Sequence, residues 1–301
     1  MKIEKLKTMK NKIRQYLKLS FFLFALIAIS KDLKSQAPTE NATLWKISGN
    51  GLSETSYLFG TIHMMCKEDY KMSDRVVEAV QKSDRIALEL DMDDPQLQVK
   101  MQKLSVSPEM KNIKENLSAE EVTIVDNYFK SSYGSGIAQV GVLKPFVLSS
   151  MVMINSAGCE IVQYEAEFVK LAQHQEKELI GLETVEFQFG LFDELDYESQ
   201  VESLVESIQY PEKTKALLNE MQSAYLAKDL QEIESLMEEH EEIPGFNEKL
   251  LDERNQKWIS EISEYSKNAS VFYAVGVGHL PGSKGVIALL REAGYEVNPV
   301  D

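Results

Sequence analysis

Ser56-Tyr-Leu-Phe-Gly-Thr-Ile-His63 and Val271-Phe-Tyr-Ala-Val-Gly-Val-Gly-His279 are the two stretches that decide the fold. Each is an apolar run typical of a buried strand, followed by Gly-x-x-His. The chain has only 4 histidines, so half of them stand in this repeated pattern. Because glycine lets the backbone turn sharply after a strand, each imidazole can stand at a strand end over a cleft. The repeat therefore predicts a functional site at the ends of two strands.

Short apolar runs alternate with amphipathic helical stretches from Leu44 onward, which favours an α/β fold. Ser73 can cap a helix that ends near Lys82 and lies between the strand candidates 57–61 and 85–90. Such a strand–helix–strand unit normally has a right-handed crossover and two parallel strands. Further strand candidates cover 178–182, 271–275 and 295–298. We therefore expect a central mixed, largely parallel sheet flanked by helices.

Several other stretches have helical patterns. Ser118 followed by Glu121 has the pattern of a capping box at the start of a helix. The apolar stretch 142–157 is typical of a buried helix, and the stretch 247–267 is typical of a long amphipathic helix. The stretch 190–245 is helical, very acidic and without strand candidates. We interpret it as a helical cap that is inserted between the halves of the α/β unit and covers the cleft.

Residues 1–37 have the pattern of an export signal. Seven basic residues up to Lys18 precede the apolar run 19–29, and Ser35-Gln-Ala37 offers small residues for cleavage. The run is too short to span a bilayer comfortably, although an uncleaved anchor is the alternative. We expect an exported protein, periplasmic or extracellular, with no stable membrane insertion after cleavage and a single domain over 38–301.

The chain is strongly acidic. Its formal net charge is −16, and residues 1–37 hold nine basic and two acidic residues, which leaves about −23 on residues 38–301. A surface of this charge repels nucleic acid and anionic lipid. We therefore expect neither as a partner.

The two cysteines are Cys66 and Cys159. Export would allow a disulfide to persist between them, but their spacing says nothing about their distance in the fold. We expect two unpaired, buried thiols, with a disulfide as the alternative.

Four side chains should meet at one edge of the sheet, because the C-terminal ends of parallel strands share an edge. They are His63, Glu89, Glu183 and His279. Two imidazoles and one carboxylate suit a divalent ion with a position left for water, and a second carboxylate can act as general base. We take His63, His279 and Glu183 as ligands, although Glu89 and Glu183 can exchange roles. Structural roles for each residue are the alternative.

Arg254 lies on the same helical face as Leu251 and Trp258. An arginine on an apolar stripe is normally paired, and a site carboxylate is its natural partner, with an unrelated ion pair as the alternative. The sequence contains no Gly-x-Ser-x-Gly, phosphate-binding loop or Gly-x-Gly-x-x-Gly. Serine catalysis and nucleotide use therefore have no support.

The order of these motifs resembles that of the TraB/GumN family, which is related to the Tiki metalloproteases that cleave Wnt proteins. The motifs that carry the resemblance are Leu44-Trp-Lys-Ile47, Ser56–His63, Ala87-Leu-Glu-Leu90, Gly181-Leu-Glu-Thr184, Arg254-Asn-x-x-Trp258 and Val275-Gly-Val-Gly-His-Leu280. The resemblance covers essentially all of residues 38–301. It implies a shared α/β fold with the glutamates and paired histidines at the site, supported by Arg254 and Asn255.

For the Tiki branch the resemblance implies a peptidase that depends on manganese or cobalt rather than zinc. We therefore expect a metal-dependent hydrolase that acts on a peptide or protein substrate. The wider superfamily includes esterase-like hydrolases and haem-binding lipoproteins, and fold alone does not decide between them. A peptide- or haem-sequestering binding protein without turnover and a metal-free ester hydrolase remain the alternatives.

Overall fold

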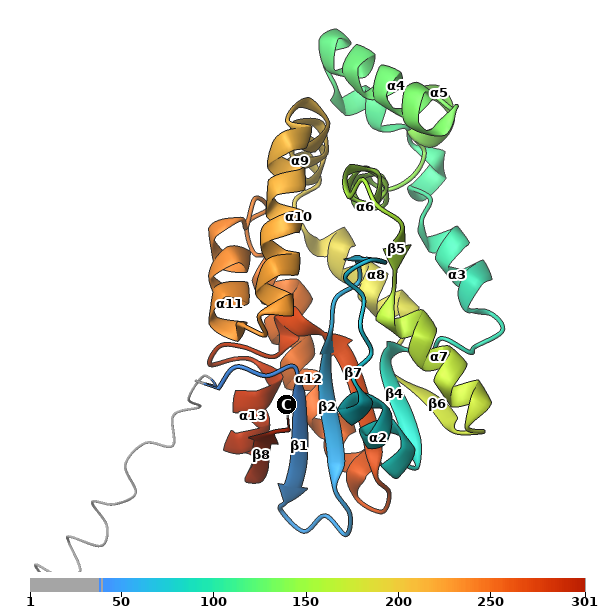
Figure 1. Ribbon diagram of the computed structural model, residues 1–301. Helices are drawn as coiled ribbons and strands as arrows, with labels where there is room; N and C mark the ends of the chain where they lie inside the picture. Colours follow the sequence, from blue (N-terminus) through green and yellow to red (C-terminus); the bar gives the residue numbers. More distant parts are fainter. Residues whose placement is uncertain (1–37, 39, 301) are drawn as a thin grey trace, which may run out of the picture. The chain divides into compact units, whose positions relative to one another are not determined.

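A computed structural model describes residue 38 and residues 40–300, so the predicted signal peptide lies outside the described residues. Within the described part, no helix has both the length and the apolar character needed to cross a membrane. One six-stranded sheet has the order β6-β4-β7-β2-β1-β8 (Figure 1). Its strands are β1 (Leu44–Gly49), β2 (Ser56–Thr61), β4 (Arg85–Leu90), β6 (Glu178–Glu183), β7 (Val271–Gly276) and β8 (Tyr295–Pro299).

The sheet is mixed and largely parallel, which confirms the predicted fold class. Strands β6, β4, β7 and β2 run parallel, whereas β1 is antiparallel to both β2 and β8. The predicted parallel arrangement of β2 and β4 is correct. The two strands are not adjacent, because β7 lies between them. Every residue of β7 is buried, as expected for the centre of a covered sheet.

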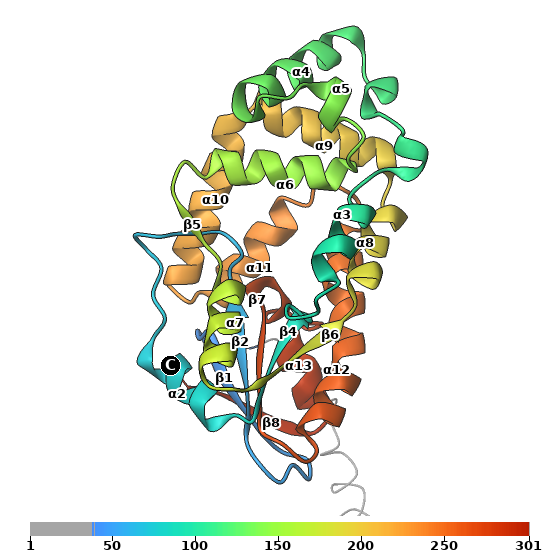
Figure 2. The same cartoon turned by 90° about the vertical axis from the view of Figure 1, so that its right-hand side faces the viewer.

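Helices cover both faces of the sheet (Figure 2). On one side lie α2 (Asp74–Lys82) and α7 (Tyr164–His174), and on the other lie α12 (Glu253–Ser266) and α13 (Val286–Glu292). Ser73 caps α2 with its side chain, as predicted. The main core lies between these layers and the sheet. A one-turn π-helix, η3 (Glu248–Asp252), leads directly into α12 and completes the long helix predicted over 247–267.

The remaining helices lie beyond the C-terminal ends of the parallel strands (Figure 2). They include the predicted cap, because residues 190–245 are helical and contain no strand. Residues 97–156 add further helices to it, and the two parts share a second apolar core, which includes Phe129, Leu148 and Leu204. The helices are α3 (Leu97–Leu104), η1 (Pro108–Met110), η2 (Ile113–Asn116), α4 (Ala119–Tyr133), α5 (Ile137–Val140), α6 (Pro145–Ser156), α8 (Val185–Glu194), α9 (Tyr197–Gln209), α10 (Pro211–Leu226) and α11 (Leu230–Glu239).

A separate two-stranded ribbon joins β3 (Met65–Cys66) to β5 (Ile161–Val162). In this ribbon Cys66 pairs with Ile161, and Cys159 lies two residues before Ile161. The sulfurs of Cys66 and Cys159 form a disulfide. The prediction of two unpaired thiols is therefore wrong. The pairing depends on a contact between segments 93 residues apart, which local sequence patterns do not encode.

Candidate functional site

The site lies at the C-terminal edge of the parallel strands, where all four predicted side chains meet. His63 follows β2, Glu89 lies in β4, Glu183 ends β6, and His279 stands in η4 (Val277–His279), the short turn after β7. Gly276 marks the meeting point. A Cβ atom at this position would lie 3.3 Å from Glu89 Oε1, 3.5 Å from His63 Nε2 and 3.6 Å from His279 Cδ2. The absence of a side chain at Gly276 therefore leaves space between the two imidazoles and a carboxylate.

Arg254 pairs with both glutamates of the site, as predicted for one of them. Its Nη2 donates to Glu183 Oε1 at 2.7 Å and to Glu89 Oε2 at 2.5 Å, and its Nε also donates to Glu183. Trp258 Nε1 donates to Glu183 Oε2 at 3.1 Å. Both oxygens of Glu183 are thus occupied, and its side chain is fully buried. The ligand role predicted for Glu183 is untested, and the geometry favours Glu89 for it.

Glu89 is the carboxylate that faces the imidazoles. Its Oε1 accepts a hydrogen bond from the Gly276 backbone N–H at 2.8 Å and lies 3.8 Å from His279 Nε2, whereas Oε2 accepts from Arg254 and Gln188. Burial alone would raise the pKa of Glu89, but the positive charge of Arg254, with the hydrogen bond from the Gly276 N–H, outweighs it and holds this pKa well below its usual range. Glu89 is therefore ionised.

His279 presents one ring nitrogen to the site. Asn255 Nδ2 donates to the carbonyl of Lys284, so its Oδ1 faces His279 Nδ1 at 2.7 Å. We assign the proton to Nδ1 on this basis, so the lone pair of Nε2 accepts a hydrogen bond from Arg254 Nη1 at 3.1 Å. Burial and the charge of Arg254 lower the pKa of His279 to about 3, so the ring is neutral. Asn255 thus supports the site as the sequence predicted.

His63 is more accessible, with 60% of its side chain exposed. Its Nδ1 lies 3.0 Å from Glu165 Oε1, and Thr61 Oγ1 donates to the same oxygen at 2.6 Å. Desolvation would lower the pKa of His63, but the hydrogen bond and charge of Glu165 and the charge of Glu89 raise it above its usual value. The other two histidines, His174 and His240, are exposed, as expected.

Sequence reasoning missed Glu165, Thr61 and Gln188 as members of this site. Glu165 lies in the first turn of α7, where an acidic residue needs no special explanation. No local sequence pattern marks Glu165 as a site residue. Its position follows from the ribbon of β3 and β5, which brings the start of α7 to the first Gly-x-x-His turn.

The sequence model of the TraB/PrgY/gumN family matches residues 43–299. The chain belongs to the TraB/PrgY/gumN family. One curated relative is the protein named Metalloprotease TIKI2 of Danio rerio, which is 22% identical over 316 residues. This alignment covers 85% of the present chain and 60% of the relative, so the chain spans less than two thirds of that protein's length. No solved structure matches significantly.

In this TraB/PrgY/gumN protein the cap helices hold the two histidine turns in place. Tyr225 of α10 donates to the carbonyl of Gly60 at 3.0 Å, and Gln222 donates to that of Met64 at 2.9 Å. Met237 of α11 packs against Gly278, where a Cβ would stand 2.7 Å from its sulfur. The helices α10 and α11 therefore support the two histidine turns directly.

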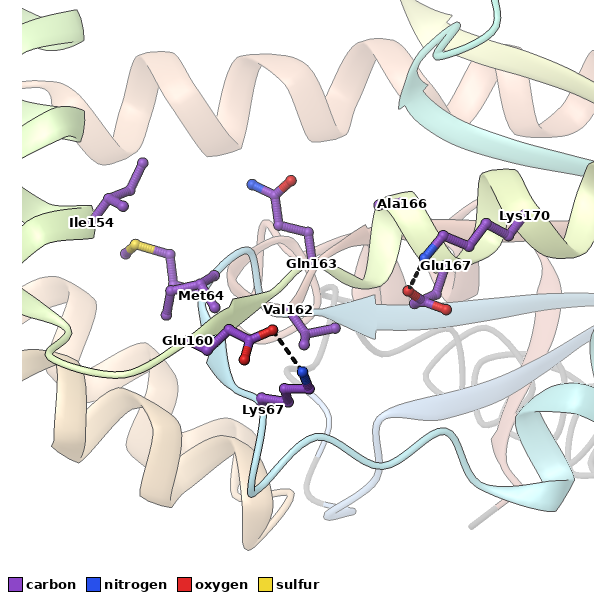
Figure 3. Close-up of a pocket in the computed structure, with 10 residues that line it drawn as sticks. Met64, Lys67, Ile154, Glu160, Val162, Gln163, Ala166, Glu167 and Lys170 are labelled. Atoms are coloured by element: carbon purple, nitrogen blue, oxygen red, sulfur yellow. Dashed lines mark hydrogen bonds and ion pairs between the residues drawn. The ribbon is translucent and has the colours of Figure 1, made fainter.

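A cavity of about 550 Å³ adjoins the first histidine turn of this TraB/PrgY/gumN site (Figure 3). Met64 and Ala166, which line it, follow His63 and Glu165 in the chain. Its walls combine apolar side chains with two ion pairs, and Figure 3 shows the lysines and glutamates of these pairs around its rim. The lining residues are Met64, Lys67, Ile154, Glu160, Ile161, Val162, Gln163, Ala166, Glu167 and Lys170. The cavity can therefore receive side chains of mixed character next to His63.

The donor set fits a divalent cation in its chemistry. Glu89 Oε1 and His63 Nε2 face the space at Gly276, whereas His279 Nε2 accepts from Arg254 Nη1 and would have to exchange this hydrogen bond for the cation. The three glutamates of the network, Glu89, Glu165 and Glu183, outnumber its one arginine, so the ionised groups sum to a negative charge. As they stand, however, the described residues include no group of three His, Cys, Asp or Glu side chains that could hold a metal. The donor atoms of His63, His279 and Glu89 would therefore have to move closer together when a cation binds.

Proposed function

We propose that this TraB/PrgY/gumN protein is an exported metal-dependent hydrolase that cleaves peptide bonds with an activated water molecule. The observation that carries the proposal is the convergence of His63, His279 and Glu89 on the space above Gly276. The name of the Danio rerio relative, a metalloprotease, agrees with it. The proposal extends the family membership, which by itself indicates no more than a hydrolase-like fold.

His63 Nε2, His279 Nε2 and Glu89 would hold the cation, which we take to be Mn²⁺ or Co²⁺. A cation bound by such ligands lowers the pKa of water and polarises a substrate carbonyl. Asn255 orients His279, and the Gly276 N–H orients Glu89. These contacts keep the donor atoms in place before substrate arrives, which is what efficient electrostatic catalysis requires.

Glu183 would act through Arg254. By accepting from Nε and Nη2 along one edge of the guanidinium, it fixes the arginine against Glu89, so a positive charge stands at the edge of the site. That charge can stabilise negative charge that develops on a substrate oxygen. The cavity beside Met64 would receive a substrate side chain next to the scissile bond.

A metal-free ester hydrolase is the second candidate, and one observation favours it. His63 is hydrogen-bonded to Glu165 through Nδ1, and a carboxylate-bound imidazole is a general base. In that mechanism hydrolysis survives removal of metal, whereas in the metal-dependent one it is lost.

The deciding experiment compares chelated wild-type protein with His63→Ala and His279→Ala. Binding of Mn²⁺, Co²⁺ and Zn²⁺ is measured by calorimetry, and cleavage of a peptide library by mass spectrometry. Stoichiometric binding that both substitutions abolish, with cleavage restored by added metal, supports the proposal. Cleavage that persists in chelator supports the ester hydrolase, and a Soret band on haem titration without any cleavage supports a binding protein.

A further inference from the structure

The two site histidines are held by the same device, although different residues supply it. His279 Nδ1 faces the amide oxygen of Asn255 at 2.7 Å, and His63 Nδ1 faces the carboxylate oxygen of Glu165 at 3.0 Å. In His63 the Nε2 atom then faces the space at Gly276, whereas in His279 the Nε2 atom accepts from Arg254 Nη1 at 3.1 Å. Asn255 belongs to a sequence motif of the site, but Glu165 belongs to none.

Glu165 is itself held by a second donor, which binds the same oxygen as His63. Thr61, the last residue of β2 and 1% exposed, donates to Glu165 Oε1 at 2.6 Å. The Glu165 side chain is only 17% exposed. An ordinary surface ion pair has two mobile partners, whereas here a buried hydroxyl holds the carboxylate at one position.

The backbone around Glu165 is also tied to that around His63. The ribbon pairs Met65 with Val162, and the disulfide links Cys66 to Cys159, so the segments on which His63 and Glu165 lie are joined twice. The approach of α7 to the first histidine turn is thus fixed by covalent and hydrogen bonds before the side chains meet.

We propose that Glu165 is a positioning residue that holds the His63 ring with Nδ1 protonated and Nε2 directed at the site. The proposal rests on the proposed function in that it assigns Nε2 to a cation. Partners of this kind, which hydrogen-bond the second nitrogen of a ligating histidine, typically raise metal affinity by about 10- to 100-fold. Without Glu165 the exposed ring would rotate and its preferred tautomer would place the proton on Nε2.

The test compares Glu165→Leu, Glu165→Gln and Thr61→Val in the full chain. Glu78→Gln is the matched control, because Glu78 pairs with Lys82 at the surface of α2 and does not line the cavity. Co²⁺ affinity is measured by calorimetry, and the His63 tautomer by ¹⁵N NMR of the metal-free protein at a pH where this ring is neutral.

We expect Glu165→Leu to weaken Co²⁺ binding about 10- to 100-fold and to move the His63 proton to Nε2. Glu165→Gln should lose less, because its amide oxygen can still accept from Nδ1, and the control should match wild type. Unchanged affinity and an unchanged tautomer in folded Glu165→Leu would overturn the proposal. If Glu165→Leu does not fold, Glu165→Gln and Thr61→Val decide, and wild-type values in both would overturn it.

The two measurements separate this inference from the proposed function. If wild-type protein binds no Co²⁺, the metal-dependent hydrolase is refuted, and the tautomer of His63 still shows whether Glu165 positions the ring. A proton on Nε2 in the wild-type protein would refute the positioning role, whatever the metal result.

Discussion

Arg254 donates hydrogen bonds to both carboxylate oxygens of Glu183, and neither side chain is more than 6% exposed. A buried pair of this kind adds little net stability, because both charges lose their hydration. Removal of one member of the pair is strongly destabilising, because the partner that remains is a buried charge without a counterion. Arg254 also contacts Glu89, so two carboxylates depend on one guanidinium.

We therefore expect Arg254→Met to lower the free energy of unfolding by about 3–5 kcal/mol. The control is Lys130→Met, which breaks the pair with Asp126 at the surface and should cost less than about 1 kcal/mol. Denaturant unfolding followed by circular dichroism measures both values. Equal costs for the two variants would show that the buried network has no special role in stability.

Gly276→Ala should damage the site and spare the fold. The backbone at Gly276 has a φ of −52°, which alanine adopts freely, but the new methyl group would stand among Glu89, His63 and His279. We expect at least a tenfold loss of Co²⁺ affinity with a nearly unchanged melting temperature. Gly190→Ala is the control, because nothing lies within 4 Å of its Cβ position. Wild-type affinity in Gly276→Ala would place the cation elsewhere.

Loss of the disulfide should destabilise the protein through the unfolded state. The bond closes a loop of 93 residues, and chain-entropy estimates give about 4–5 kcal/mol for a loop of this size. We expect the double variant Cys66→Ser, Cys159→Ser to unfold at lower denaturant and to be insensitive to reductant, unlike wild type. Peptide mapping without reductant tests the bond directly, and two free thiols in the purified protein would contradict the structure.

Tyr225→Phe should loosen the first histidine turn. The substitution leaves the carbonyl of Gly60 buried without the hydroxyl that now donates to it, at a cost of about 1–3 kcal/mol. Tyr210→Phe, at a residue that is 51% exposed, should be nearly neutral. Hydrogen exchange at residues 60–64 should accelerate in Tyr225→Phe and stay at the wild-type rate in Tyr210→Phe. The same rate in both variants would argue against support of the first histidine turn by α10.

The sequence is sufficient for those parts of the fold that depend on local pattern or on general rules of connection. The strand over 85–90 has the predicted bounds, because its apolar residues stand between polar neighbours. The meeting of His63, Glu89, Glu183 and His279 follows from the rule that parallel strands end at one edge. Arg254 was assigned a carboxylate partner because an unpaired arginine on an apolar stripe is too costly.

The features that were missed all depend on contacts between distant segments. The ribbon of β3 and β5 has only two residues in each strand, which is too short to show a periodic pattern. The disulfide and the contact between Glu165 and His63 both follow from that ribbon. The capping box at Ser118 and the helical pattern over 142–157 are local signals, but the core that these helices share with α9 cannot be read from any single helix.

The central position of β7 makes synthesis of this late segment a condition for assembly of the site. This strand, close to the C-terminal end of the described residues, inserts between β2 and β4, and it carries Gly276 and leads into His279. A growing or truncated polypeptide that ends before β7 can hold neither the sheet nor the second imidazole. Because such long-range strand pairings form late in folding, the site with Gly276 and His279 would form only in a molecule whose sheet is complete. The candidate site is therefore assembled only when the central strand of the sheet has been added.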